Sequence, residues 1–124
     1  MKLMIVEDDS FMIQLYHNLF KLEGFEVELA KDGLEALDKL KTAEKVPDII
    51  LLDIMMPRMD GFEFLRQRNK VDKLKNIPVV VLSNLFSEED QEKIKKLGAK
   101  GFITKSEQDP KELVKKVKEY LPKS

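Results

Sequence analysis

The sequence predicts an α/β protein in which helices cover both faces of a five-stranded parallel sheet. Two observations support this fold class. Short apolar runs alternate five times with amphipathic stretches along the 124 residues, which is typical of repeated βα units. The third and fourth runs, DIILLD and PVVVLS, are mostly aliphatic, as expected of strands buried on both faces. Right-handed crossovers then give a doubly wound sheet, whose ligands bind beyond the carboxyl ends of the strands.

Five segments have the composition and length of strands. Four of them are compact apolar or β-branched runs, and FEVELA, the second in chain order, alternates apolar and polar residues like a half-buried strand. The predicted strands are Lys2–Glu7, Phe25–Ala30, Asp48–Asp53, Pro78–Ser83 and Lys100–Thr104.

Short polar side chains predict where the intervening helices begin. Asp32 with Glu35 forms a capping box, and Pro110 directly after Asp109 suits the first turn of the last helix. The predicted helices run from Phe11 to about Leu22 with Ser10 as the cap, from Asp32 to about Lys41, from about Gly61 to Asn69, from Ser87 to about Leu97, and from Pro110 to about Leu121.

The composition argues against several classes of protein. The chain has no cysteine, so it has no disulfide framework, thiolate nucleophile or cysteine-based zinc site. Its single histidine, His17, argues against a multi-histidine metal site. The net charge of -1, from 22 basic and 23 acidic residues, provides no basic field to hold nucleic acid.

The chain also lacks the patterns of membrane and secreted proteins. No apolar run approaches the length of about 20 residues that a membrane span needs, and the first residues, MKLMIVEDD, become acidic too early for a signal peptide. We therefore expect one cytoplasmic domain over residues 1–124, with no output domain and no membrane contact.

Polar side chains stand where the predicted strands end. They are Glu7, Asp8 and Asp9 after the first strand, Asp53 after the third, Ser83 at the end of the fourth, and Thr104 and Lys105 at the end of the fifth. The carboxyl ends of parallel strands meet at one rim of the sheet. We therefore expect up to four carboxylates, a hydroxyl and an ammonium group to share that rim.

Such a rim suits a hard divalent cation. Crowded carboxylates repel each other, and a cation removes that repulsion. Mg²⁺ prefers oxygen ligands and commonly binds one or two carboxylates together with water and phosphate oxygens. We expect Asp8 and Asp53 to bind Mg²⁺, with the backbone carbonyl of Met55 as a third ligand. Glu7 and Asp9 are expected to lie just outside, holding metal-bound water.

The same groups suit phosphoryl transfer. A carboxylate can attack a phosphoryl group and form an acyl phosphate, and the reaction then depends on positioning and on neutralising the phosphoryl oxygens. Mg²⁺ would bind one of these oxygens, the Lys105 ammonium a second, and the Ser83 hydroxyl with a nearby backbone N–H the third.

Four blocks of the sequence resemble the receiver domain of two-component response regulators. They are the VEDD start, the stretch DIMMPRMDGFEFL that begins at Asp53, the strand VVVLSN and the segment GAKGFITK, in that order and spacing over essentially the whole chain. Each block alone is weak, but the four together are specific. The resemblance, to a stand-alone receiver of the chemotaxis-regulator type, implies a flavodoxin-like fold with strand order 2-1-3-4-5.

The resemblance also implies a role for each rim residue. By similarity, Asp53 is the phosphoacceptor, Asp8 a direct metal ligand, Glu7 its acidic neighbour, Ser83 the switch hydroxyl, Lys105 the phosphate-binding lysine and Phe102 the rotating aromatic residue. A sensor histidine kinase or phosphotransfer domain would supply the phosphoryl group, with Mg²⁺ as cofactor. The surface of residues 87–97, 100–104 and 110–121 would then change for a downstream protein target. Such a protein signals and catalyses only its own phosphorylation and dephosphorylation, as a monomer or a phosphorylation-dependent dimer.

Two further surfaces follow from the helical patterns. The stretch SEEDQEKIKKL carries only Ile94 and Leu97 as substantial apolar anchors, so we expect this helix to pack weakly and to shift easily. Phe11 and Ile13 fall toward the edge of the first helix near the acidic rim. We expect them to form a docking patch for the kinase.

Two positions depart from the family's pattern. Ser106 follows Lys105 where the family usually has proline, and Asn84 follows the switch hydroxyl where the family favours a very small residue. Asn84 is expected to narrow the phosphoryl pocket or to contact the phosphoryl group, and so to change the rates of phosphorylation or dephosphorylation. These departures keep a second interpretation open, a degenerate receiver that binds partners without phosphorylation, against which the intact Asp8, Asp53, Ser83 and Lys105 argue.

Three classes of α/β protein with comparable sheets require residues that this chain lacks. A flavin-binding carrier needs a hydroxyl- and glycine-rich phosphate loop where this chain has its acidic triplet. An aspartate-based phosphohydrolase typically needs a second aspartate two residues after the first, where this chain has Met55. A nicotinamide-binding fold needs G-x-G-x-x-G, which is absent.

Overall fold

A computed structural model describes residues 1–84, 87–107 and 109–121, and within these the chain forms five strands, five α-helices and one short 3-10 helix. The strands are β1 (Lys2–Val6), β2 (Glu26–Ala30), β3 (Ile49–Leu52), β4 (Val79–Ser83) and β5 (Gly101–Thr104). The helices are α1 (Ser10–Leu22), α2 (Gly33–Thr42), α3 (Gly61–Asn69), α4 (Glu88–Lys96), the 3-10 helix η1 (Lys105–Glu107) and α5 (Pro110–Glu119). None of the helices in these ranges has the length and apolar character needed to span a bilayer.

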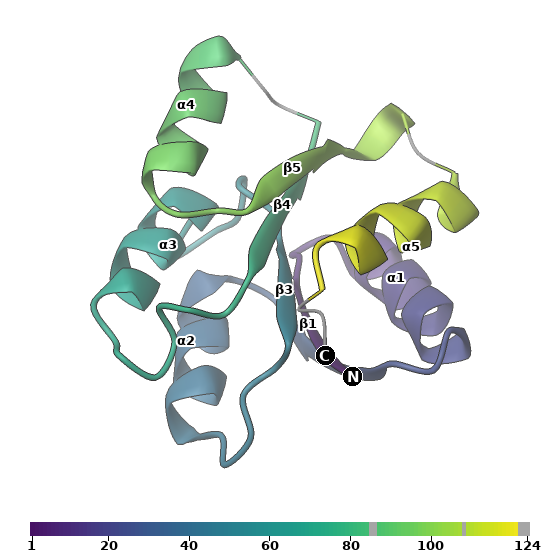
Figure 1. The fold of residues 1–124 in the computed structure, drawn as a ribbon, viewed down its shortest axis with the longest axis horizontal. Helices are drawn as coiled ribbons and strands as arrows, with labels where there is room; N and C mark the ends of the chain where they lie inside the picture. The colour runs from purple at the N-terminus through teal and green to yellow at the C-terminus, as the bar shows by residue number, and fades with distance from the viewer. Residues whose placement is uncertain (85–86, 108, 122–124) are drawn as a thin grey trace.

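The strands form one parallel sheet in the order β2-β1-β3-β4-β5. Helices α1 and α5 cover one face of it, and α2, α3 and α4 cover the other (Figure 1). This arrangement confirms the predicted doubly wound fold and the strand order that the resemblance implied.

Alternation along the strands divides the core between the two faces. On β1, Leu3 and Ile5 belong to the cluster with α1 and α5, whereas Met4 and Val6 belong to the cluster with α2, α3 and α4. The helices contribute Tyr16, Phe20, Leu113 and Val117 to the first cluster, and Leu37, Leu40, Phe64, Leu65 and Ile94 to the second. The four apolar side chains of β1 are all buried, as the apolar run predicted.

Helix α4 has the weakest apolar anchoring. It begins after the cap Ser87, whose hydroxyl accepts a hydrogen bond from the Asp90 amide at 3.0 Å. Its one buried residue is Ile94, while Leu97 at its end is half-buried. The structure thus shows the two apolar anchors that the sequence predicted, and the weak packing of this helix stays a prediction.

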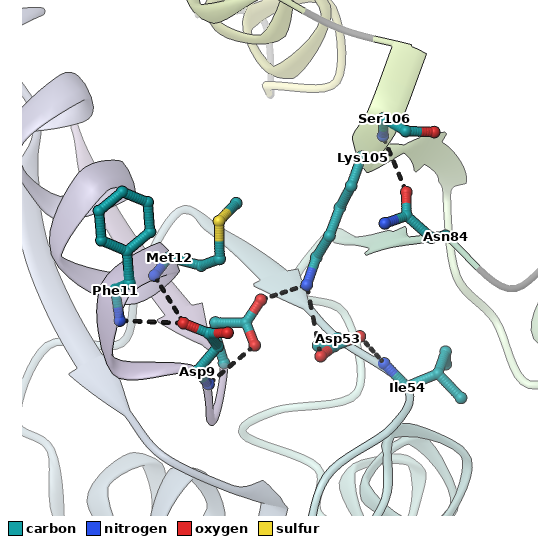
Figure 2. Close-up of polar contacts among 9 residues, drawn as sticks. Asp9, Phe11, Met12, Asp53, Ile54, Asn84, Lys105 and Ser106 are labelled. Carbon is teal, nitrogen blue, oxygen red and sulfur yellow. Dashed lines mark hydrogen bonds and ion pairs between the residues drawn. The ribbon is translucent and has the colours of Figure 1, made fainter.

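One predicted helix cap was wrong. The cap of α1 is Asp9 rather than Ser10, and the Asp9 carboxylate accepts hydrogen bonds from the amides of Phe11 at 2.9 Å and Met12 at 3.0 Å (Figure 2). Both residue types favour the cap position. Asp9 prevails because the chain already turns into the helix at Ser10.

Candidate functional site

The ends of β1 and β3 bring two acidic residues together. The amide of Glu7 donates to the carbonyl of Ala30, and the amide of Asp53 donates to the carbonyl of Val6, each at 3.0 Å. These bonds extend the sheet by one residue on each strand. As a result Glu7 and Asp53 stand side by side at the rim, 3% and 7% exposed.

Lys105 joins the two carboxylates. Its ammonium forms an ion pair with Glu7 Oε1 and lies 3.5 Å from Asp53 Oδ2. Figure 2 shows its side chain extending from the start of η1 down to Asp53. Burial by itself lowers the pKa of Lys105, but the hydrogen bond to Glu7 and the negative charges of Asp53 and Glu7 outweigh burial, so the pKa lies above its usual value. The ammonium stays charged at neutral pH.

Both carboxylate oxygens of Glu7 have partners. Its Oε2 accepts a hydrogen bond from the Asp9 amide at 3.1 Å, and its Oε1 faces Lys105. Burial raises the pKa of Glu7, the bond from Lys105 opposes that rise, and the charge of Asp53 adds to it, with a net increase. The neighbouring Asp8 is exposed, yet desolvation and the charge of Glu7 raise its pKa as well.

Three carboxylates are close enough for one cation. Glu7, Asp8 and Asp53 each offer an oxygen, and these oxygens lie within 4.8 Å of one another. Desolvation by burial is the main reason that the pKa values of Glu7 and Asp8 are raised, and the charge of a neighbouring carboxylate adds to each rise. An oxygen-preferring divalent cation fits such a site. Met55, two residues beyond Asp53, has an exposed side chain.

An apolar floor lies under the carboxylates. Tyr16 from α1 is 5% exposed and lines a small hollow together with Leu51, Leu82, Glu7 and Asp53. Burial in these surroundings raises the pKa of Tyr16 to about 12, because the opposing effect of the Lys105 charge is smaller and the acidic groups nearby add to the rise. This floor prevents water from solvating the carboxylates from below, which explains the desolvation of Glu7. Tyr16 was not among the predicted site residues.

The remaining predicted site residues are Ser83, at the end of β4, and Phe102, within β5. Ser83 is 2% exposed and is paired in register with Thr104, directly before Lys105. Phe102 is half-buried, packs against the cluster of the α2–α4 face, and lines a surface groove of about 510 Å³ with residues of α4. Phe102 therefore lies at the boundary between core and surface.

Comparison with known proteins identifies the family. Residues 3–118 match the response regulator receiver domain. The chain belongs to this receiver family. It is 39% identical over 123 residues to the transcriptional regulatory protein CpxR homolog of Haemophilus influenzae, a match that spans 99% of this chain but 51% of that protein. It is 34% identical over 118 residues to the polar-differentiation response regulator DivK of Brucella anthropi, a match that covers 95% of this chain and 94% of that one.

Solved structures agree with this assignment. The chemotaxis response regulator CheY4 of Vibrio cholerae superposes with a TM-score of 0.88 and 33% sequence identity, over 97% of this chain and 98% of that one. The receiver domain of a signal transduction histidine kinase from Syntrophus aciditrophicus superposes with a TM-score of 0.85 and 31% identity, over 97% of this chain and 89% of that one.

The two departures from the receiver pattern contact each other. The side-chain oxygen of Asn84, after β4, accepts a hydrogen bond from the backbone amide of Ser106 at 2.8 Å (Figure 2). A proline at position 106 has no N–H and cannot make this bond. The short helix η1, which begins at Lys105, is thus tied to the residue that follows β4 by a bond that a proline at position 106 would prevent. The sequence marked each position separately but gave no sign that they pair.

A second tertiary contact, an ion pair between Asp32 and Arg58, was not predicted from the sequence. The buried carboxylate of Asp32, before α2, binds the guanidinium of Arg58 in the loop after β3. Asp32 was predicted only as a helix cap, a role it also has, since it accepts from the Glu35 amide at 2.8 Å. The two residues are 26 positions apart, so no local pattern connects them.

Proposed function

We propose that this receiver domain is a phosphorylation-dependent signalling switch that accepts a phosphoryl group on Asp53. The donor would be the phosphohistidine of a sensor kinase or phosphotransfer domain. The observation that carries the proposal is the placement of Lys105, whose ammonium touches Glu7 and lies 3.5 Å from Asp53. This puts a nucleophile and a charge-stabilising group side by side at the open end of the sheet.

The proposed chemistry is an in-line transfer between two nucleophiles. A carboxylate oxygen of Asp53 forms a bond to phosphorus while the bond from phosphorus to the donor's imidazole nitrogen breaks, and the electron pair leaves with the imidazole. The Lys105 ammonium neutralises one phosphoryl oxygen, and the Ser83 hydroxyl donates to another. The receiver catalyses only this transfer and the later hydrolysis of its own acyl phosphate.

A divalent cation would complete the charge balance. Asp8, Asp53 and the backbone carbonyl of Met55 would hold it, with Glu7 and Asp9 beside it. When bound, Mg²⁺ supplies positive charge to these carboxylates and to the phosphoryl oxygens. The residues fit such an ion because the carboxylate oxygens of Glu7, Asp8 and Asp53 cluster within 4.8 Å of one another.

The response to phosphorylation would reach the surface of α4, β5 and α5. A phosphoryl group adds about -1.5 to -2 charges and strong acceptor oxygens, toward which Ser83 would move. Phe102 then turns inward and leaves the groove beside α4. Because α4 buries only Ile94, a coupling free energy of about 1–3 kcal/mol is enough to shift it. A downstream protein that binds this surface would read the change.

Intact-mass spectrometry tests the proposal directly. The wild type and Asp53→Asn are incubated with acetyl phosphate, with and without Mg²⁺. We expect one added phosphoryl group that requires both Mg²⁺ and Asp53. No adduct, together with a thermal midpoint that Mg²⁺ does not change, would support the degenerate receiver that binds partners without phosphorylation. An adduct that persists in Asp53→Asn would assign the nucleophile to another residue.

A further inference from the structure

The loop after β3 is held tightly at both of its ends. At its start, the Asp53 carboxylate accepts a hydrogen bond from the Ile54 amide at 2.8 Å. At its end, the Gly61 amide donates to the Ile54 carbonyl at 2.9 Å. A Cβ atom on Gly61 would lie 2.6 Å from the backbone oxygen of Asp53. The first turn of α3 therefore packs directly on the backbone of the proposed phosphoacceptor.

The middle of this loop contains a strained turn. Arg58 has a φ of 63° and is the one non-glycine residue with positive φ in the described part of the chain. The Met59 amide donates to the carbonyl of Pro57 at 2.7 Å, which closes a three-residue turn around Arg58. Such turns with positive φ are rare and strained. They persist only where surrounding contacts hold them, and they concentrate at functional sites.

Asp32 holds this turn from the N-terminus of α2. The Arg58 Nε donates to Asp32 Oδ2 at 2.8 Å and its Nη2 donates to Oδ1 at 3.2 Å. This two-pronged geometry is the stronger form of an arginine–carboxylate pair. Asp32 is 5% exposed, and the bond from Arg58 lowers its pKa. Asp32 therefore stays ionised and can hold Arg58 throughout the neutral range.

A second contact attaches the same helix terminus to the same turn. The Gly33 amide donates to the Met59 carbonyl at 3.2 Å. A Cβ atom on Gly33 would lie 2.9 Å from Met59 Cγ and 3.0 Å from its backbone oxygen. The lack of a side chain at Gly33 thus permits a close approach of α2 to the loop. Together, Asp32 and Gly33 fix both the side chain and the backbone of the turn.

We propose that Arg58, held by Asp32, is a positioning residue that fixes the loop of residues 54–60 for cation binding beside Asp53. This inference rests on the proposed function, because the loop carries Met55, the proposed source of a backbone ligand. A cation that binds a backbone carbonyl needs that carbonyl in place beforehand, and a strained turn three residues away would relax without its clamp. Free-energy linkage then makes the Asp32–Arg58 pair part of the Mg²⁺ affinity, although neither side chain reaches the ion.

Mg²⁺ binding measured by calorimetry, alongside the thermal midpoint without Mg²⁺, tests the inference. Arg58→Asn removes the guanidinium but keeps a residue that tolerates positive φ, and Asp32→Asn keeps a helix cap but removes the charge. We expect each change to raise the Kd for Mg²⁺ about tenfold, which corresponds to about 1.4 kcal/mol. The double variant should match the single ones, since both remove the same contact.

Two further variants sharpen the test. Arg58→Lys keeps the charge without the fork and should give a Kd between those of the wild type and Arg58→Asn. Arg66→Asn is the matched control, because it removes an arginine whose ion pair with Glu63, at 3.1 Å, lies on α3 with both side chains half-buried. Its Kd for Mg²⁺ should equal that of the wild type.

The outcomes separate the inference from the function on which it rests. If Arg58→Asn and Asp32→Asn lower the thermal midpoint but bind Mg²⁺ as tightly as the wild type, the pair is a structural clasp and the inference is overturned. If the wild type itself binds no Mg²⁺, the proposed function and the inference fall together. A tenfold loss of affinity in both variants, with Arg66→Asn unchanged, supports the positioning role.

Discussion

Replacing Lys105 by methionine should reveal how strongly the rim depends on this ammonium group. The change leaves Glu7 and Asp53, which are 3% and 7% exposed, without the ammonium between them. At 3.5 Å and an effective dielectric constant of about 20, the attraction between Lys105 and Asp53 alone is roughly 5 kcal/mol. Loss of the desolvation penalty of Lys105 and protonation of Glu7 offset part of it. We expect the free energy of unfolding at pH 7 to fall by about 2–4 kcal/mol.

The pH dependence of this loss has a definite sign. The pKa of Glu7 in the folded protein lies above its ordinary value of 4.5, so the folded state binds the proton more tightly than the unfolded state. The contribution of Glu7 to stability is therefore present at low pH and decreases as the pH rises through the folded pKa. Lys105→Met raises that pKa further, so its deficit should shrink as the pH is lowered from 7 toward about 4.5.

Urea unfolding followed by far-ultraviolet circular dichroism measures both effects. Lys118→Met is the control, because Lys118 pairs with Glu23 at 3.4 Å with side chains 50% and 43% exposed, a kind of pair that contributes less than about 1 kcal/mol. Mg²⁺ should stabilise Lys105→Met more than the wild type, since it replaces the missing charge. Equal losses for the Lys105 and Lys118 variants, or a Lys105 deficit that does not vary with pH, would refute this account of the rim.

Three other changes probe separate parts of the molecule. Phe11 is 74% exposed, and Phe11→Asp should slow phosphoryl transfer from a kinase but leave phosphorylation by acetyl phosphate intact. An equal loss of rate in both assays would contradict the docking role. Gly61→Ala would place a Cβ 2.6 Å from the Asp53 carbonyl oxygen and should lower the free energy of unfolding by about 3 kcal/mol. Gly24→Ala, where only the positive φ matters, should lower it by about 1 kcal/mol. Equal losses for the two glycine variants in urea unfolding would contradict the close packing of α3 on Asp53. The pKa of Asp32 is lowered in the folded protein, so its contribution to stability is lost as the pH falls through that pKa. In Asp32→Asn the free energy of unfolding should therefore depend less on pH below about pH 4. If urea unfolding shows the same pH dependence there for the variant and the wild type, the ion pair adds no stability.

The fold followed from the sequence because its strongest signals are local. The aliphatic runs of β3 and β4 have no alternative to a buried position, and the caps Asp32, Ser87 and Asp109 each accept the expected amide. Asp9 and Ser10 are adjacent, and both residue types are favoured as helix caps, so the preference for cap residues does not predict which of them caps α1. The strand order came from the resemblance to receivers, since local patterns leave several orders open.

The site could be predicted only as far as strand ends determine it. Parallel strands bring Glu7, Asp53 and Lys105 to one rim whatever their side chains do, and the structure places them there. Lys105 has a long flexible side chain. Its closer contact with Glu7 than with Asp53 depends on the burial of these groups, which cannot be predicted from the sequence. The contact between Asp32 and Arg58 joins two loops through tertiary packing, so no spacing rule could have found it.

The hydrogen bond between Asn84 and Ser106 has a consequence for how receiver sequences diverge. The donor is a backbone amide, so it disappears whenever proline occupies position 106, and the Asn84 side chain then loses that reason to be retained. Conversely, a small residue at position 84 leaves the Ser106 amide without this acceptor. Selection on one position therefore depends on the residue at the other. Among related receivers, an amide side chain at position 84 should accompany a residue other than proline at position 106. Substitutions at the two positions should therefore occur together.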